Sequence, residues 1–218
     1  GGFPGATEDH VNGLAYMHEI YTRADPRYSG RATVPALWDK KTGTIVNNES
    51  ADIVRMFNSG FGDLADNAVD LYPYGLQAEI DALNDRIYPA LNNGVYRTGF
   101  ATTQVAYEEA YHGVFAMLDE LEGRLAGGHT FLFGDRLVET DIRLFVTLVR
   151  FDAAYFGLFK TNKRRIADYP HLQAYMLRML EVPGVRETVS LEHIKAGYYS
   201  VKALNPTGIV PVGPELSW

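Results

Sequence analysis

Residues 24–58 read ADPRYSGRATVPALWDKKTGTIVNNESADIVRMFN, and this stretch decides the fold. Two short runs of strand-forming residues lie within it, at 33–39 and at 44–46. Residues 40–43, Lys-Lys-Thr-Gly, have the length and the glycine of a hairpin connection, so we expect the two strands to pair antiparallel. Residues 49–57 predict a helix directly after the second strand.

A further helix is predicted before the strands, over residues 8–24. Its core-facing positions recur at three-to-four spacing, at Val11, Leu14, Ala15, His18 and Tyr21. Asp25-Pro26 ends this helix, because proline disfavours the helical conformation in the residue before it. Residues 8–60 therefore predict the order helix, strand, strand, helix.

The pattern changes at residues 60–75, which we interpret as a linker. Glycine and proline break the periodicity there and aspartates keep the stretch hydrated, at Gly60, Gly62, Pro73, Gly75, Asp63, Asp66 and Asp70. The rest of the chain is almost wholly helical in pattern, with candidate helices at 76–93, 103–126, 139–159, 168–181 and 187–199. The helix at 103–126 is the clearest, with an apolar stripe of Tyr107, Tyr111, Val114, Phe115, Leu118, Leu121 and Leu125.

This order predicts a mostly helical α+β protein of two packed units. We expect a smaller domain in residues 1–62, a linker at 63–75, an all-helical domain at 76–203 and an irregular tail at 204–218. A two-stranded sheet is marginal on its own, so we expect the smaller domain to begin before residue 1.

The composition narrows the classes of function. The chain has 218 residues, of which 46% are hydrophobic, which is enough for one large domain or two small ones. Its formal charge of −7 makes it a poor candidate for binding nucleic acid through its overall field. No apolar run approaches the roughly 18 residues that span a bilayer, and no secretory signal opens the chain. We therefore expect no membrane association and a cytoplasmic location.

Several common chemical motifs are absent: GxGxxG, the P-loop, HExxH and GxSxG. The histidines stand singly, without metal-ligand spacing, so we expect no metal site; they are His10, His18, His112, His129, His171 and His193. A basic cluster, Lys160, Lys163, Arg164 and Arg165, precedes Asp168. It indicates a solvated loop between helices or, alternatively, a surface that attracts an anionic ligand or lipid.

Two dipeptides within residues 24–58 are candidate binding features. Val34-Pro35 opens a strand, as in the thioredoxin-like fold, where the bond before such a proline is usually cis and the preceding amide and carbonyl face outward. An extended peptide can pair with such a backbone edge. Glu49-Ser50 opens a helix, whose unpaired amides and serine hydroxyl suit a carboxylate. The alternatives are an ordinary strand start and an ordinary helix start.

Together these features are similar to the glutathione site of the glutathione transferase family, and residues 24–58 resemble its Xi class, the glutathionyl-hydroquinone reductases. Three more segments carry the resemblance: NNGVYRTGFATTQVAYEEA at 92–110, DIRLFVTLVRFDAAY at 141–155 and EVPGVRETVSLEHIKAGYY at 181–199. The resemblance covers about residues 8–210. It implies a glutathione transferase fold, in which residues 1–62 form the second half of a thioredoxin-like domain and an all-helical domain follows.

The resemblance implies glutathione as cosubstrate. Val34, before an expected cis Pro35, should pair with the cysteinyl backbone of glutathione. Glu49 and Ser50 should hold its γ-glutamyl end, and Arg31 should contact one of its carboxylates. These five residues form the predicted glutathione site.

The resemblance also implies a quinone pocket lined by Tyr96 and Tyr198, with the adjacent Tyr199 as a less certain contact. A tyrosine hydroxyl there should hydrogen-bond the quinol oxygen. Considered without the resemblance, both tyrosines are half-buried packing residues among the 14 tyrosines of the chain.

The family's chemistry is nucleophilic. A cysteine thiolate attacks the glutathione sulfur of a glutathionyl-hydroquinone, the hydroquinone leaves, and a second glutathione resolves the mixed disulfide. These 218 residues contain no cysteine, so we expect an inactive fragment that lacks the N-terminal segment with that cysteine. The alternatives are a non-catalytic binding protein of the same fold and an omega-like cysteine-type transferase. The resemblance further implies a homodimer.

One position departs from the family's pattern. A buried helix in the helical domain usually begins Ser/Thr-x-x-Asp, but LVETDIRLF puts Val138 at the capping position and keeps Asp141. Loss of a capping hydroxyl typically costs about 1 kcal/mol. We expect Glu139 or Thr140 to shift the cap by one residue.

Overall fold

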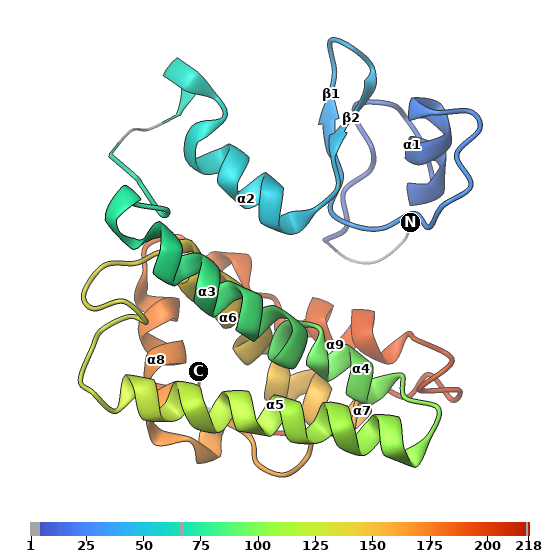
Figure 1. Cartoon of the computed structure of the whole chain (residues 1–218). Helices are drawn as coiled ribbons and strands as arrows, with labels where there is room; N and C mark the ends of the chain where they lie inside the picture. Colours follow the sequence, from blue (N-terminus) through green and yellow to red (C-terminus); the bar gives the residue numbers. More distant parts are fainter. Residues whose placement is uncertain (1–4, 66–67, 217) are drawn as a thin grey trace. The chain divides into compact units, whose positions relative to one another are not determined.

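The structure, a computed structural model, describes residues 5–65, 68–216 and 218 (Figure 1). The chain divides into two compact units, Gly1–Asp70 and Leu71–Trp218, which we call the N-terminal unit and the helical unit. Residues 66–67 of the expected linker, Asp66 among them, lie outside the described residues.

The N-terminal unit contains a helix, two strands and a second helix: α1 (Met17–Ala24), β1 (Leu37–Asp39), β2 (Thr44–Asn47) and α2 (Ser50–Ser59), followed by a short 3-10 turn, η1 (Gly62–Leu64). The strands pair antiparallel, with Trp38 opposite Ile45 and Asp39 opposite Thr44. The predicted order of elements is therefore confirmed.

The predicted start of the first helix, near residue 8, is wrong. The carboxylate of Asp9 accepts the backbone N–H groups of Val11 (3.0 Å) and Asn12 (2.9 Å), so this segment folds into a turn. Glu19 then closes the first turn of α1, because its carboxylate accepts the Tyr16 N–H at 2.7 Å. The local hydrogen bonds of Asp9 override the helical spacing.

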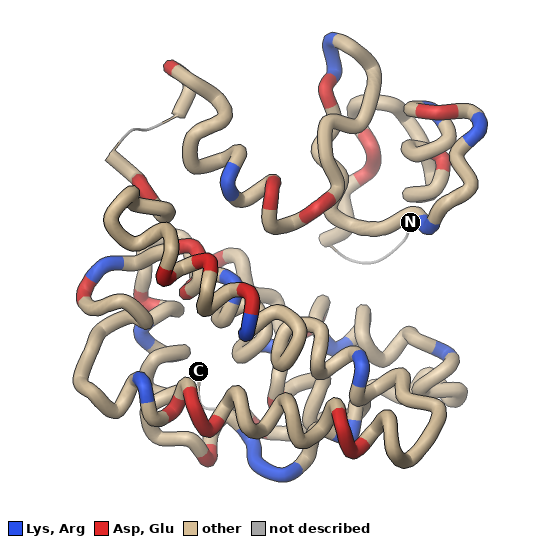
Figure 2. Tube along the Cα trace, viewed as in Figure 1, with Lys and Arg blue, Asp and Glu red and all other residues tan. Residues whose placement is uncertain are grey.

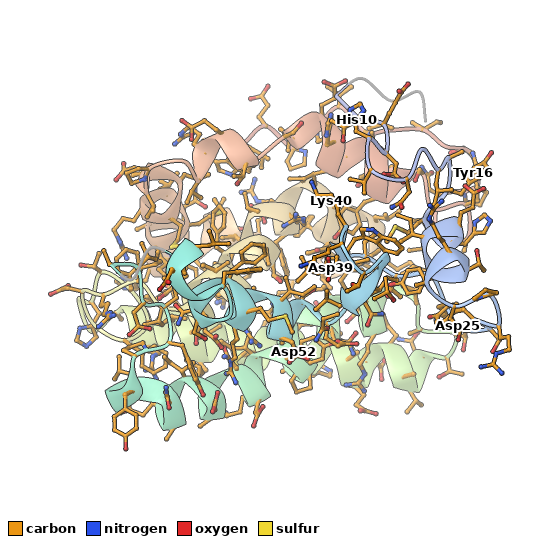
Figure 3. The ribbon with its side chains drawn as sticks, turned by 90° about the horizontal axis from the view of Figure 1, so that it is seen from above. His10, Tyr16, Asp25, Asp39, Lys40 and Asp52 are labelled. Atoms are coloured by element: carbon orange, nitrogen blue, oxygen red, sulfur yellow. The ribbon has the colours of Figure 1, made fainter. Side chains whose placement is uncertain are left out.

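The connection between the strands is held by Asp39, labelled in Figure 3 together with Lys40. Its carboxylate accepts the Lys41 N–H at 2.7 Å and the Thr42 hydroxyl at 2.6 Å. These hydrogen bonds, the Thr42 hydroxyl first among them, lower the pKa of Asp39. Gly43 has φ +68°, which explains the glycine at this turn position.

The helical unit is built from helices joined by short turns. The elements in chain order are η2 (Tyr74–Leu76), α3 (Gln77–Ile87), η3 (Tyr88–Asn92), α4 (Gly94–Gly99), α5 (Gln104–Leu125), α6 (Glu139–Arg150), η4 (Phe151–Tyr155), α7 (Phe156–Leu158), η5 (Ile166–Asp168), α8 (Pro170–Glu181), η6 (Arg186–Thr188) and α9 (Leu191–Tyr199). The longest, α5, crosses the whole unit in Figure 1. Its predicted stripe is buried at Val114, Phe115, Leu118, Leu121 and Leu125.

Two of the predicted helices, 76–93 and 139–159, are interrupted by π-helical turns, which the spacing of apolar residues in the sequence does not predict. In η3, Pro89 has no N–H to donate, and Asn93 donates to the Tyr88 carbonyl, five residues back, at 2.8 Å. In η4, Phe156 likewise donates to the carbonyl of Phe151. Each turn adds a residue to the helical cycle and so rotates the helix that follows it.

The structure shows how α6 begins although Val138 has no capping hydroxyl. The cap does not shift: Val138 remains the N-cap residue and provides no side-chain hydrogen bond. Instead, the Glu139 N–H donates to the Leu71 carbonyl at 2.8 Å, and the Asp141 carboxylate accepts the Val138 N–H at 2.9 Å. A backbone carbonyl and a carboxylate thus satisfy amides at this helix start without a capping hydroxyl.

The described part of the tail, residues 204–216 and 218, is irregular, as expected, and is attached to α9 by a buried lysine. Lys195 donates from Nζ to the carbonyls of Pro211 (3.4 Å), Val212 (2.7 Å) and Gly213 (3.1 Å). These three bonds satisfy an ammonium group that would otherwise be costly to bury. Among the described residues, no helix is long and apolar enough to cross a membrane.

Candidate functional site

The predicted glutathione residues all lie on the surface of the N-terminal unit. Arg31, Val34, Pro35, Glu49 and Ser50 are exposed, Val34 to 76%. The bond between Val34 and Pro35 is cis, as the sequence predicts. Within the described residues, the side chains of Arg31, Glu49 and Ser50 make no hydrogen bond or ion pair, so they are available to a ligand.

Tyr21 brings the two halves of this candidate site together. Tyr21 is the buried residue of α1, and its hydroxyl donates to the Thr33 carbonyl at 2.8 Å and accepts from the Asn48 amide at 3.2 Å. Thr33 and Asn48 directly precede Val34 and Glu49 in the chain. One hydroxyl therefore holds the exposed Val34 backbone beside the start of α2.

The start of α2 has the character of an anion site. The Asn47 side chain accepts the Glu49 N–H at 2.7 Å, and the Ile53 N–H makes the first intrahelical bond, to the Glu49 carbonyl. No side chain caps the amides of the first turn. Such amides and the helix dipole together favour a carboxylate.

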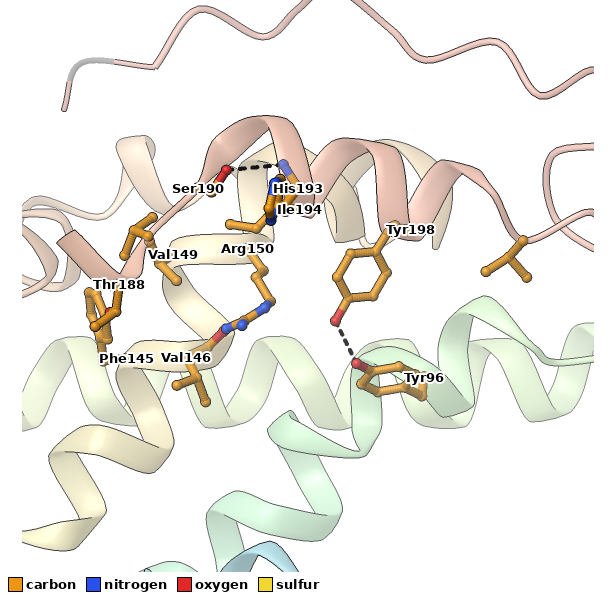
Figure 4. A pocket seen from close by; sticks show the side chains of 13 residues that line it. Tyr96, Phe145, Val146, Val149, Arg150, Thr188, Ser190, His193, Ile194 and Tyr198 are labelled. Atoms are coloured by element: carbon orange, nitrogen blue, oxygen red, sulfur yellow. Dashed lines mark hydrogen bonds between the residues drawn. The ribbon is translucent and has the colours of Figure 1, made fainter. Parts of the chain in front are cut away.

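A second candidate site lies in the helical unit, where three tyrosine hydroxyls meet. The hydroxyls of Tyr96 and Tyr198 are 2.6 Å apart, although 102 positions separate the two residues in the chain (Figure 4). The Tyr198 hydroxyl also lies 2.7 Å from that of Tyr155. We call Tyr96, Tyr198 and Tyr155 the tyrosine chain.

The elements around η4 set the geometry of the tyrosine chain. Tyr155 is the last residue of η4, a type of turn that often occurs at functional sites, and only 2% of its surface is exposed. Its ring stacks on Phe159 at 5.2 Å between centroids, and Tyr198 meets it edge-on at 5.1 Å. Gly99 allows Phe159 to approach, because a Cβ there would lie 2.4 Å from its ring.

Tyr96 and Tyr198 line a cavity of about 510 Å³ within the helical unit. Its lining is largely apolar, with Phe145, Val149 and Ile194 among the lining residues, and Arg150 and His193 contribute polar groups (Figure 4). An apolar cavity with a few polar groups is the usual form of a site for a small organic ligand.

Burial dominates the electrostatics of the tyrosine chain. It raises the pKa of Tyr155 and of Tyr198, and the neighbouring tyrosines raise that of Tyr155 further. Arg150 opposes this effect at Tyr198, because its charge favours the phenolate. Both phenols are therefore neutral near pH 7, as hydrogen-bond donors must be.

Two residues that organise these sites do not stand out in the sequence: Tyr155 and Tyr21. Tyr155 ends a segment that carried the family resemblance, but nothing in its spacing connects it with Tyr198. Tyr21 had the helical spacing of a core residue, which its buried ring confirms, while its hydroxyl contacts are long-range. Tyr199, the less certain candidate, is half-buried, and burial raises its pKa. Its hydroxyl makes no hydrogen bond with the tyrosine chain.

The basic cluster is largely neutralised by neighbouring acids. Lys163 and Arg164 lie 3.3 and 3.6 Å from the Asp119 carboxylate, and Arg165 pairs with Asp168 at 2.8 Å. Figure 2 shows charges of both signs spread over the helical unit. These pairs favour the solvated-loop interpretation. In the part of the chain that the structure describes, no cluster of three or more His, Asp or Glu residues could hold a metal ion.

Comparison with known proteins identifies the family. Residues 104–178 match the family model "Glutathione S-transferase, C-terminal domain". The chain is 55% identical over 207 residues to the glutathionyl-hydroquinone reductase PcpF of Sphingobium chlorophenolicum, covering 94% of this chain and 66% of that protein.

Solved structures agree with this match. The glutathione-bound structure of YqjG, a glutathione transferase homologue from Escherichia coli K-12, superposes with a TM-score of 0.96 at 50% identity, covering all of this chain and 70% of YqjG. The glutathione transferase Xi of Phanerochaete chrysosporium gives a TM-score of 0.94 at 48% identity, covering 98% of this chain and 73% of that one.

The chain therefore belongs to the glutathione transferase family, and it is similar to members of the Xi class and to glutathionyl-hydroquinone reductases. Its fold is the glutathione transferase fold, with a small sheet and helices in the N-terminal unit and an all-helical second unit, as the sequence predicted. The chain spans just under two thirds of the length of PcpF.

Proposed function

We propose that this chain provides the glutathione site and the quinol pocket of a glutathionyl-hydroquinone reductase. The observation that carries the proposal is the meeting of the Tyr96 and Tyr198 hydroxyls, 2.6 Å apart at the wall of an apolar cavity. The family resemblance independently predicts that these two residues contact a quinol oxygen. The exposed Val34 backbone and the uncapped start of α2 support the glutathione half.

The proposed reaction is thiol–disulfide chemistry on an aryl thioether. A thiolate attacks the glutathione sulfur, so a sulfur–sulfur bond forms and the bond from sulfur to the ring carbon breaks. The electron pair of the broken bond passes to the ring, which takes up a proton and leaves as hydroquinone. A second glutathione then reduces the mixed disulfide and yields oxidised glutathione.

The tyrosines would act on the leaving ring. Negative charge develops on the ring as the sulfur departs, and it can reach a ring oxygen. A phenol hydrogen directed at that oxygen stabilises this charge. The thiolate would come from outside residues 1–218, since these residues contain no cysteine, and the chain by itself would be inactive.

The test uses the full-length protein and glutathionyl-menadione. We expect glutathione to bind in a calorimetric titration and menadiol to be released with multiple turnovers. Binding without turnover would instead support a non-catalytic protein of the same fold. Turnover of dehydroascorbate in place of glutathionyl-menadione would support an omega-like transferase. A homodimer and a cytoplasmic location stay predictions; size-exclusion chromatography with light scattering tests the first.

The glutathione half is tested by Ser50→Ala. We expect the Kd for glutathione to rise about tenfold, because a hydrogen bond to a charged group contributes about 1.5 kcal/mol or more. Isothermal titration calorimetry on the full-length protein measures it. Ser59→Ala is the matched control at the other end of α2, where the hydroxyl donates to the Arg55 carbonyl. Equal affinities of the two variants would remove Ser50 from the site.

Tyr21→Phe tests how the glutathione site is held together. The variant keeps the buried ring but loses the bonds of the hydroxyl to Thr33 and Asn48. We expect a threefold to tenfold rise in the Kd for glutathione (about 1 kcal/mol), since one structural hydrogen bond contributes about that much. Tyr107→Phe is the comparison, because its hydroxyl donates to the Lys160 carbonyl in the helical unit; it should leave the Kd unchanged. An unchanged Kd in Tyr21→Phe would show that Thr33 and Asn48 stay side by side without the Tyr21 hydroxyl.

A further inference from the structure

The three hydroxyls of the tyrosine chain differ in their access to solvent. Tyr155 is 2% exposed, whereas Tyr96 is 38% exposed, and Tyr198 lies between them with a hydroxyl contact to each. The series therefore runs from the packed interior of the helical unit to the wall of the cavity. Each hydroxyl has one hydrogen to donate and lone pairs to accept.

A count of hydrogens sets the direction of these bonds. Three hydroxyls have three hydrogens, and the two contacts between them use two. The hydroxyl of Tyr155 has its close hydrogen-bond contact with Tyr198, at 2.7 Å, and its hydrogen-bonding interaction with the Tyr96 hydroxyl is weaker. If Tyr155 accepted from Tyr198, its buried hydrogen would be left with only the weaker contact to Tyr96, which is less favourable. The short contact is therefore best satisfied when Tyr155 is its donor.

We propose that Tyr155 is a positioning residue: its hydroxyl donates to Tyr198, Tyr198 donates to Tyr96, and the remaining hydrogen, on Tyr96, points into the cavity. The last step rests on the proposed function, in which this hydrogen meets a quinol oxygen. Successive donation in one direction polarises each bond and strengthens the terminal donor. Tyr155 thereby sets the direction of donation, so that the Tyr96 hydroxyl acts as a hydrogen-bond donor to a ligand in the cavity.

The causes that shift the pKa of Tyr198 are compatible with this direction. Burial is the main cause that raises its pKa; the bond from Tyr155 lowers it, and the bond to Tyr96 raises it. A donor to the phenolate oxygen lowers the pKa of a phenol, and an acceptor of its hydrogen raises it. Tyr198 thus has the character of an acceptor toward Tyr155 and of a donor toward Tyr96.

The test measures the pKa at position 198 directly. The full-length protein is prepared with 2,3,5-trifluorotyrosine at position 198, a more acidic phenol that titrates in an accessible range, and is followed by fluorine NMR. In the Tyr155→Phe background we expect its pKa to rise by roughly one unit, the size of one lost hydrogen bond. A fall in the pKa would reverse the direction of the chain, and no change would remove Tyr155 from it.

The matched control is Tyr199→Phe, which removes a neighbouring half-buried hydroxyl that does not bond to the tyrosine chain. We expect no change in the pKa at position 198 in this variant. An equal rise of the pKa at position 198 in both variants would mean that the loss of any nearby hydroxyl raises it. That result would overturn the proposal. Because the NMR measurement needs no substrate, it remains decisive even if the proposed reductase activity fails.

A kinetic cycle tests the last step. In the full-length protein we expect Tyr155→Phe to lower kcat toward glutathionyl-menadione about fivefold with little change in KM. In a Tyr198→Phe background the same change should have no further effect, since the link to Tyr96 is already broken. Additive losses in the double variant would show a packing role and contradict the proposal.

Discussion

Replacing Tyr96 and Tyr198 together by phenylalanine is expected to lower kcat/KM toward glutathionyl-menadione by at least about 100-fold in the full-length protein. Loss of a donor that stabilises developing negative charge typically costs about 10²–10³ in rate. The rings stay in place, so the wall of the cavity keeps its shape and only the hydroxyls are lost. Steady-state kinetics with glutathionyl-menadione measure the effect.

Two controls separate this effect from damage to the fold. Tyr107→Phe removes a hydroxyl that donates to the Lys160 carbonyl, outside the cavity, and should leave kcat/KM within about twofold. The affinity of the double variant for glutathione should be unchanged, because the predicted glutathione residues belong to the N-terminal unit. Full activity in the double variant would contradict the role of the tyrosines and, with it, the proposed quinol pocket.

Asp141→Ala is expected to destabilise the helical unit by about 3–5 kcal/mol, the range for removing one partner of a buried charged network. Asp141 is fully buried, and its carboxylate accepts the N–H groups of Leu132 (3.0 Å) and Val138 (2.9 Å) and the hydroxyl of Tyr175 (2.9 Å). The variant leaves the N–H groups of Leu132 and Val138 buried and unpaired, and the Tyr175 hydroxyl keeps only its 3.3 Å contact with the Asp141 carbonyl. Urea unfolding followed by circular dichroism measures the loss.

The comparison for this variant is Asp135→Ala. Asp135 is an exposed aspartate a few residues earlier, and it accepts a single side-chain bond, from Thr130 at 2.7 Å. We expect its loss to change the unfolding midpoint only slightly. If both variants unfold at the same urea concentration as the unmodified chain, the network around Asp141 does not support the start of α6.

The stability contributed by Asp141 should also depend on pH. Burial is the main cause that raises the pKa of its carboxyl in the folded state, although its three donors oppose it. The folded protein then holds this proton to higher pH than the unfolded chain. The stability of the protein relative to Asp141→Asn should therefore be greatest below about pH 4 and fall as pH rises through the raised pKa of the folded state. A relative stability that grows with pH would show a lowered pKa instead.

Local signals explain which elements could be predicted. The hairpin at residues 40–43 follows from a glycine-containing turn between two strand-forming runs, and α5 begins after Thr103, whose hydroxyl accepts the Ala106 N–H. Such signals act between residues a few positions apart. They fail where another local bond competes, as at Asp9, or where Pro89 changes the helical cycle without ending the helix.

The sequence by itself determined the order of helices and strands, because turn, capping and periodic patterns act over short stretches of chain. Its resemblance to the glutathione transferase family implied which residues should contact glutathione and quinol. Only the tertiary structure decided that Tyr155 joins Tyr96 and Tyr198, and that Tyr21 holds Thr33 beside Asn48. A hydroxyl has no preferred partner in the sequence. It bonds to whichever acceptor the packing of distant helices brings within about 3 Å.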